Sequence, residues 1–210
     1  PVEPQPAATS TITSIAAAPD GAIWCGSQSG WPNTLCYYKD GKWTQVPTDE
    51  SLSSSSIISI SIGPNGDVWL GTTNGAFRLS GGKWTSFTTK DGLSDNYVLK
   101  LRVLQDNTVV SITTNGAGHF DGTKFTSFGL NVLQSAPDVT GDTLDNLKFA
   151  TSFGVLEKTT TSTWNMYTSS EYSNVGFGAV KKITILPSSS PRSISVDSRG
   201  TIWCGTMYGI

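Results

Sequence analysis

The chain has little of what catalytic and metal sites are usually built from. It contains 1 histidine and 3 cysteines among 210 residues, and charged residues make up only 14%. A single histidine cannot form a histidine-based zinc site, and no Cys/His cluster has zinc-ligand spacing. The Gly-x-Ser-x-Gly motif of serine hydrolases is absent too. The sequence therefore predicts no metal, no cofactor and no catalytic residue.

A basic excess and long apolar runs are also lacking. The formal net charge of −2 excludes the basic surface that nucleic-acid binding needs. No apolar run approaches the ~20 residues of a membrane-spanning helix, so we expect no membrane segment in this chain. Residues 1–11 begin at Pro1 and contain two further prolines, which predicts a linker or a processed N-terminus.

What the sequence does contain is an internal repeat. Lys-Trp-Thr at 42–44 returns at 83–85, as Lys-Phe-Thr at 124–126, and more loosely as Thr-Trp-Asn at 163–165. The aromatic residue of this motif recurs every ~40 residues, a period typical of solenoids and propellers.

A second motif precedes the first. Ile-Trp-Cys-Gly at 23–26 recurs as Val-Trp-Leu-Gly at 68–71 and as Ile-Trp-Cys-Gly at 202–205. Each copy follows a turn signal such as Pro-Asn-Gly at 64–66, and an alternating run such as Ile-Ser-Ile-Ser-Ile at 58–62 precedes the turn. Such turns favour tight hairpins, and such alternation has the period of a half-buried strand.

One repeat thus predicts four antiparallel strands, over 57–62, 67–72, 76–80 and 83–88. Four short strands in each repeat form the blade of a β-propeller. The predicted fold is all-β, with about five four-stranded blades, at about 12–48, 57–90, 97–130, 138–170 and 192–210. Residues 47–56, 129–137 and 168–191 are expected to be long connections between blades.

These motifs resemble a known family. Residues 64–75, Pro-Asn-Gly-Asp-Val-Trp-Leu-Gly-Thr-Thr-Asn-Gly, are followed by Lys-Trp at 83–84 and Asp-Gly-Leu-Ser at 91–94. The pattern is similar to the two-component-regulator propeller repeat, strongly in blades 1, 2 and 5 and weakly in blades 3 and 4. The resemblance implies a sensor-type, ligand-binding propeller in the periplasm or outside the cell, often joined to signalling or carbohydrate-related modules. The repeat specifies architecture better than activity.

The last blade is expected to be incomplete, since its outer strands would follow Gly209-Ile210. The ring could close with one thin blade, belong to a larger propeller, or be completed by a partner chain. We favour the larger propeller, because exposed strand edges invite unwanted pairing.

A binding face is predicted where loops vary over the rigid blades. Two kinds of connection vary most in length. One joins the second strand of a blade to the third, and the other joins one blade to the next. Near the centre of this face we expect five ligand-binding residues: Trp31, Asn74, Asn115, Phe153 and Tyr208. Asn74 and Asn115 each precede a glycine, so turn formation is the stronger interpretation for them.

Tryptophan is abundant, with 7 residues. Six of them occupy repeat positions, where burial against the neighbouring blade explains their presence. Trp31 lies in a lengthened loop and is either a ligand contact or a loop anchor.

The remaining polar candidates favour structural roles. His119 is expected on the polar face of an outer strand. Asp138, Asp142 and Asp145 lack the calcium-loop register and predict turns. Cys25 and Cys36 could face each other across a hairpin and form a disulfide in an oxidising compartment, although buried thiols are the default, and Cys204 would remain unpaired.

The preferred function is therefore a non-enzymatic propeller that recognises an extracellular glycan or protein. Two alternatives stay open. A carbohydrate-active enzyme, a glycosidase or lyase, would need two acidic groups near the central channel. A protein-interaction scaffold would show a flat face without a pocket.

Overall fold

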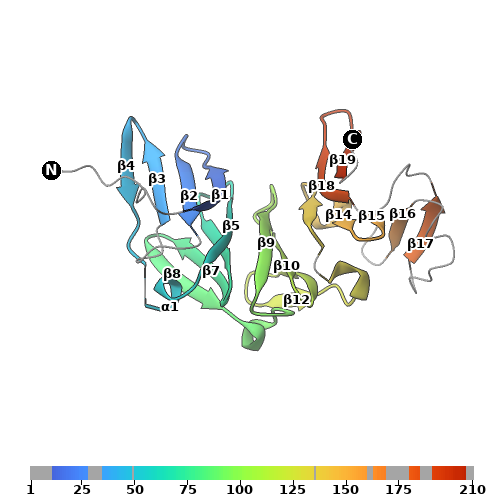
Figure 1. Ribbon diagram of the computed structural model, residues 1–210, viewed down its shortest axis with the longest axis horizontal. Coiled ribbons are helices and arrows are strands. Elements are labelled where there is room, and N and C mark those ends of the chain that lie inside the picture. The colour runs from blue at the N-terminus through green and yellow to red at the C-terminus, as the bar shows by residue number, and fades with distance from the viewer. Residues whose placement is uncertain are drawn as a thin grey trace.

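The computed structural model describes residues 11–27, 35–48, 50–134, 136–159, 163–168, 180–184 and 191–206, and for 180–184 the backbone alone. These residues form a succession of small β-sheets, which follow one another along an arc (Figure 1). The predicted β-propeller is confirmed. Within the described part of the chain, no helix is long and apolar enough to cross a membrane.

The first three blades each contain four strands in chain order, and every neighbouring pair is antiparallel. Blade 1 contains β1 (Ile12–Ala17), β2 (Ile23–Ser27), β3 (Leu35–Lys39) and β4 (Lys42–Gln45). Blade 2 contains β5 (Ile57–Ile62), β6 (Val68–Thr72), β7 (Gly75–Ser80) and β8 (Lys83–Phe87). Blade 3 contains β9 (Val98–Val103), β10 (Val109–Thr113), β11 (Gly116–Phe120) and β12 (Phe125–Ser127).

Blades 4 and 5 depart from this pattern. Blade 4 contains β13 (Asp138–Thr140), β14 (Lys148–Thr151), β15 (Gly154–Lys158), β16 (Trp164–Thr168) and a fifth strand, β17 (Val180–Thr184). The β17 strand runs parallel to β16 on the outside of the blade, within residues expected to be only a connection. In blade 5 the structure describes β18 (Pro191–Val196) and β19 (Ile202–Thr206).

The connections contain short helices that the repeat did not predict. Helix α1 (Glu50–Ser53) precedes blade 2, and 3-10 turns occupy η1 (Thr89–Asp91), η2 (Asn131–Leu133) and η3 (Leu144–Asn146). Leu52 of α1 and Leu133 of η2 are both 0% exposed. Helices α1 and η2 therefore each anchor a connection by burying one leucine, whereas η1 and η3 bury no residue.

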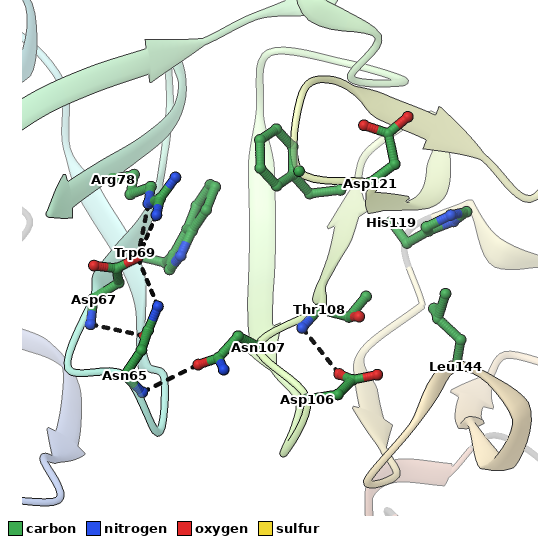
Figure 2. Close-up of a pocket in the computed structure, with 12 residues that line it drawn as sticks. Asn65, Asp67, Trp69, Arg78, Asp106, Asn107, Thr108, His119, Asp121 and Leu144 are labelled. Carbon is green, nitrogen blue, oxygen red and sulfur yellow. Dashed lines mark hydrogen bonds and ion pairs between the residues drawn. The ribbon is translucent and has the colours of Figure 1, made fainter.

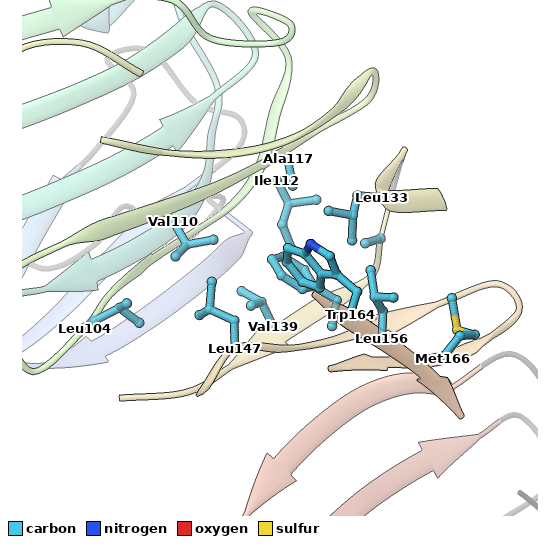
Figure 3. Close-up of a cluster of buried hydrophobic side chains, with 12 residues drawn as sticks. Leu104, Val110, Ile112, Ala117, Leu133, Val139, Leu147, Leu156, Trp164 and Met166 are labelled. Atoms are coloured by element: carbon cyan, nitrogen blue, oxygen red, sulfur yellow. The ribbon is translucent and has the colours of Figure 1, made fainter. Parts of the chain in front are cut away.

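Adjacent blades are held together by apolar clusters that combine residues of both. Blade 3 contributes Val110, Ile112 and Ala117 to the largest of them, and blade 4 contributes Val139, Leu147 and Trp164 (Figure 3). Trp69 and Trp164 are only 3% and 6% exposed, as expected for tryptophans at repeat positions. Trp203 differs, because 51% of its surface is exposed.

A polar seam accompanies this packing along the inner strands. Ser59 Oγ accepts a hydrogen bond from the backbone N–H of Leu101 at 3.0 Å, which joins blade 2 to blade 3. Ser61 Oγ accepts from Val103 in the same way at 2.9 Å, and Ser14 Oγ of blade 1 accepts from the N–H of Ile60 at 2.9 Å. Each such serine therefore satisfies a buried backbone donor of the next blade.

Between blades 3 and 4 an ion pair takes the place of the serine hydrogen bond. Lys100 of β9 forms an ion pair with Asp138 of β13. The other oxygen of Asp138 accepts a hydrogen bond from the backbone N–H of Ile194 in blade 5 at 3.0 Å. Asp138 thus connects three blades, and turn formation does not account for it. Among the described residues no group of three or more acidic, cysteine or histidine side chains could hold a metal ion.

Cys25 and Cys36 lie directly opposite each other on β2 and β3. Both are buried, and both are free thiols here, as is Cys204. Burial raises the pKa of all three thiols, so they contribute to the core as small apolar side chains.

Candidate functional site

The strands place their connecting segments on two faces of the arc. The turn face contains the tight turns between the first and second strands and between the third and fourth strands of each blade. The loop face contains the hairpins between the second and third strands and the long connections between blades. The residues predicted to bind a ligand belong to the loop face.

Three of those predicted residues lie at equivalent hairpin positions. Asn74 and Asn115 are exposed, and Phe153 is partly exposed. Their backbone N–H groups each donate a hydrogen bond to the threonine hydroxyl two residues earlier, at 3.0, 3.3 and 3.2 Å. This shared turn chemistry accounts for their position without a ligand. The other two, Trp31 and Tyr208, lie outside the described residues, so the loop-face site stays a prediction.

A cleft of about 370 Å³ opens on the turn face, between blades 2 and 3 (Figure 2). Its volume falls within the range of small-molecule sites. The lining residues come from the inner turns, from the second and third strands, and from the following blade: Asn65, Asp67, Trp69, Arg78, Asp106, Asn107, Thr108, His119, Phe120, Asp121, Gly122 and Leu144.

Asp67 and Arg78 form one wall of the cleft (Figure 2). Arg78 lies opposite Trp69 on the paired strand, donates from Nε to Asp67 Oδ2 at 2.9 Å, and places its guanidinium 5.7 Å from the Trp69 ring centroid. Burial opposes ionisation of Asp67, but hydrogen bonds from Ser80 and Arg78 outweigh it and lower the pKa of the carboxyl. The Asp67 carboxylate and the Arg78 guanidinium therefore neutralise each other and hold each other in place.

His119 and Asp121 line the blade 3 side of the cleft, but the His119 ring points away from Arg78, to the side on which Leu144 lies (Figure 2). Burial lowers the pKa of His119, so its imidazole is neutral at pH 7. The ring stacks on Phe128 with centroids 5.5 Å apart, and its Nδ1 is buried and has no hydrogen-bond partner among the described residues. Hydrogen bonds from the backbone of Lys124 and Thr123 lower the pKa of the exposed Asp121 carboxyl.

The inner rim is made by two neighbouring turns. The backbone N–H of Asn65 donates to Asn107 Oδ1 at 3.1 Å and joins the turns of blades 2 and 3. Asp106 is exposed beside them and accepts from the backbone N–H of Thr108 at 2.9 Å. Since Arg78 balances Asp67 and His119 is neutral, the carboxylates of Asp106 and Asp121 give the cleft a net negative charge.

A smaller cavity of about 270 Å³ lies at the corresponding turns of blades 4 and 5. Its lining includes Asp142, Asn146, Lys148 and Asp197. It contains no aromatic side chain, so it offers no apolar surface comparable with Trp69 and Phe120.

The repeat did not predict the cleft, although the sequence contains a signal for it. Arg78 and His119 occupy the same position in successive blades, each directly opposite the tryptophan position of the second strand. Glu157 follows at this position in blade 4. A position whose charge changes from blade to blade, beside a buried aromatic column, is typical of a site rather than of a repeated packing contact.

Residues 51–74, which include β5 and β6, and residues 185–208, which include β18 and β19, match the model of the two component regulator propeller. The chain contains two-component-regulator propeller repeats. No curated protein matches the chain.

Solved structures show the same fold at low sequence identity. The streptogramin B lyase structure has a TM-score of 0.71 and 20% identity, over 97% of this chain and 64% of the other. Virginiamycin B lyase from Staphylococcus aureus has a TM-score of 0.65 and 17% identity, over 96% of this chain and 68% of the other.

Sensor-system proteins from B. thetaiotaomicron are similar too. The extracellular domain of the hybrid two component system BT3049 has a TM-score of 0.67 and 19% identity over 93% of this chain. The chain spans 26% of that extracellular domain and 31% of the corresponding domain of BT4673. These likenesses establish the fold.

Proposed function

We propose that this propeller is a non-enzymatic, sensor-type binding module, and that the cleft between blades 2 and 3 holds a segment of glycan. The observation that supports this is the composition of the cleft. Hydrogen-bond donors and acceptors from Asn65, Arg78, Asn107 and Asp106 line the cleft. Carbohydrate ligands present many hydroxyl groups, and this polar lining matches them.

The charge of the cleft narrows the class of sugar. Asp106 and Asp121 are exposed, and among the described residues neither forms an ion pair with a cation. Carboxylates accept hydrogen bonds from hydroxyl and ammonium groups and repel uronic acids. The proposed ligand is therefore a neutral or amino sugar.

The repeats and the structural neighbours support a location outside the cytoplasm. Extracellular domains of two component systems have the same fold, and the repeat model is named for such regulators. We extend the proposal to a periplasmic or extracellular module. The loop face around Trp31 is kept as a second predicted contact surface for a glycan or protein.

The glycosidase alternative is less well supported. A general acid in such enzymes has a raised pKa, whereas the pKa values of Asp67 and Asp121 are lowered. The Asp67 carboxylate is also occupied by Arg78. His119 is neutral, but its Nδ1 is buried, which keeps that nitrogen from a substrate proton.

The test is a screen of the full chain against neutral, amino and uronic oligosaccharides, followed by calorimetry on the tightest binder. Asp121→Asn is expected to weaken binding about tenfold, because a hydrogen bond to a charged group contributes about 1.5–3 kcal/mol and the amide retains part of it. Asp40→Asn is the matched control, since Asp40 lies in the corresponding turn of blade 1, away from the cleft.

Three results would contradict the proposal. They are preferential binding of uronic acids, equal affinities for the two variants, and turnover of the bound sugar into product. Binding that survives Asp121→Asn but is lost in Trp31→Ala would move the site to the loop face.

A further inference from the structure

Two cysteines of blade 1 occupy facing positions in the hairpin of β2 and β3. These strands run side by side, and Cys25 is the direct register partner of Cys36 (Figure 1). Directly opposed residues of an antiparallel ladder have their Cα atoms about 4.5–5.5 Å apart. Disulfides join residues whose Cα atoms are about 4.4–6.8 Å apart. The backbone of blade 1 therefore already has the spacing that a disulfide requires.

The two side chains also share one buried site. Directly opposed residues of paired strands point to the same face of the sheet. Cys25 is 6% exposed and Cys36 is 3% exposed. Burial raises the pKa of the Cys36 thiol, and the charge of a Cys25 thiolate raises it further. The two sulfur atoms are thus close enough to influence each other.

Packing of a blade does not need thiols at this position. The hairpins of blades 2, 3 and 4 fill it with pairs that contain no cysteine, namely Leu70 with Phe77, Ser111 with Gly118, and Phe149 with Leu156. Both apolar and small pairs are therefore compatible with the repeat, and blade 1 alone among these four hairpins has a pair that can be cross-linked.

The hairpin of blade 1 also has a longer connection than its counterparts. It runs from Ser27 to Leu35, whereas the connection of blade 2 runs only from Thr72 to Gly75. In blades 2, 3 and 4 a threonine hydroxyl closes the short turn by donating to a glycine carbonyl oxygen at 2.9 Å. A longer loop costs more entropy to close. A covalent bond near this end of β2 and β3 would offset that cost.

We propose that Cys25 and Cys36 form a disulfide that fastens the hairpin when the chain folds in an oxidising compartment. The proposal rests on the location outside the cytoplasm proposed above. The oxidant is another disulfide, such as oxidised glutathione. One cysteine thiolate attacks it and releases one thiol, and the second thiolate then attacks the mixed disulfide and releases the other. Two electrons pass to the oxidant, and the two thiol protons end on the released thiols.

The exchange precedes the packing of blade 1. The thiolate is the attacking form, and burial raises the pKa of both thiols once the blade has folded. Exchange is therefore fast while the hairpin is open and slow afterwards, and the same burial protects the finished bond from reductants. Cys204 has the same Ile-Trp-Cys-Gly motif, but the residue opposite it on β18 is Ile194. Cys204 should remain a thiol.

The experiment starts from the full chain, unfolded and reduced, which is refolded in a buffer of oxidised and reduced glutathione. After alkylation in denaturant, trypsin releases residues 1–39 with both facing cysteines, because Lys39 is the first cleavage site, and residues 200–210 with Cys204. Mass spectrometry should find peptide 1–39 unlabelled and lighter by two hydrogen atoms, and peptide 200–210 carrying one label.

Thermal unfolding measures what the bond contributes. A chain refolded with dithiothreitol should have a Tm about 6–12 °C below that of the oxidised chain, as expected for the loop that the bond closes. Cys204→Ala is the matched control and should keep this difference. Cys25→Ala/Cys36→Ala should abolish it, because neither form of that variant can make the bond.

Three results would overturn the proposal. They are alkylation of both cysteines of peptide 1–39 after oxidative refolding, a link between peptides 1–39 and 200–210, and equal Tm values for the oxidised and reduced chains. Sugar binding distinguishes this inference from the proposed function, since no residue of blade 1 lines the cleft. Binding should persist in the reduced chain and in both variants, and its absence from every form would contradict the proposed function alone.

Discussion

Replacement of Ser59 by alanine tests whether the seam serines fasten the blades. Ser59 is 8% exposed, and its hydroxyl is the acceptor for the Leu101 backbone N–H at 3.0 Å. Alanine would leave that N–H buried without a partner, which costs about 1–3 kcal/mol. For a chain of this size the same loss lowers Tm by about 2–10 °C.

Urea unfolding followed by tryptophan fluorescence is the assay, because the indoles of Trp69 and Trp164 are buried between blades. Ser59→Ala should lower the midpoint at an unchanged slope, which reports the surface exposed on unfolding. Ser86→Ala is the control. It makes the same chemical change on an exposed stretch of β8 and should stay within about 0.5 kcal/mol of the wild type. Equal midpoints for the two variants would refute the role of the seam.

Two further predictions concern the cleft wall and a glycine contact. Because burial lowers the pKa of His119, the unfolded chain binds a proton more readily there, so stability should fall as pH decreases from about 6.5 toward 5. His119→Gln should reduce that slope in urea titrations at pH 7 and 5, and an unchanged slope would contradict the assignment. Gly92 has a φ of +91°, and a Cβ there would lie 2.0 Å from the Phe125 carbonyl oxygen, so Gly92→Ala should cost about 3 kcal/mol or more. Gly122→Ala shares the positive φ but meets nothing within 4 Å and should cost about 1–2 kcal/mol; similar losses for both would show that backbone strain, and not the contact, dominates.

The repeat predicted the blades well because each strand is specified locally. In blade 2 the expected strands 57–62 and 83–88 correspond to Ile57–Ile62 and Lys83–Phe87. Alternating side chains and turn residues determine such elements without reference to the rest of the chain. The β17 strand could not be predicted in this way, since it has no counterpart in other blades and its partner is the outer strand β16.

The cleft could not be predicted from the repeat for a different reason. When the blades are aligned by sequence, Arg78 and His119 occupy the same position and look equivalent. In space both line one cavity but differ in direction, because Arg78 lies against Trp69 beside blade 3, whereas the His119 ring stacks on Phe128 beside blade 4. Likewise, the exposure of Trp203 depends on what lies beside blade 5, and its motif is the same as that of Trp24.

Lys100 stands at the position where blades 1 and 2 have a seam serine, so the junction between blades 3 and 4 responds to ionic strength. Blades 1, 2 and 3 are fastened by neutral hydrogen bonds, which salt scarcely weakens. Blade 3 meets blade 4 through the Lys100–Asp138 ion pair, in which the lysine side chain is 37% exposed and open to screening. Rising salt should therefore weaken only the polar part of this junction, while the apolar cluster between blades 3 and 4 continues to hold the two blades together.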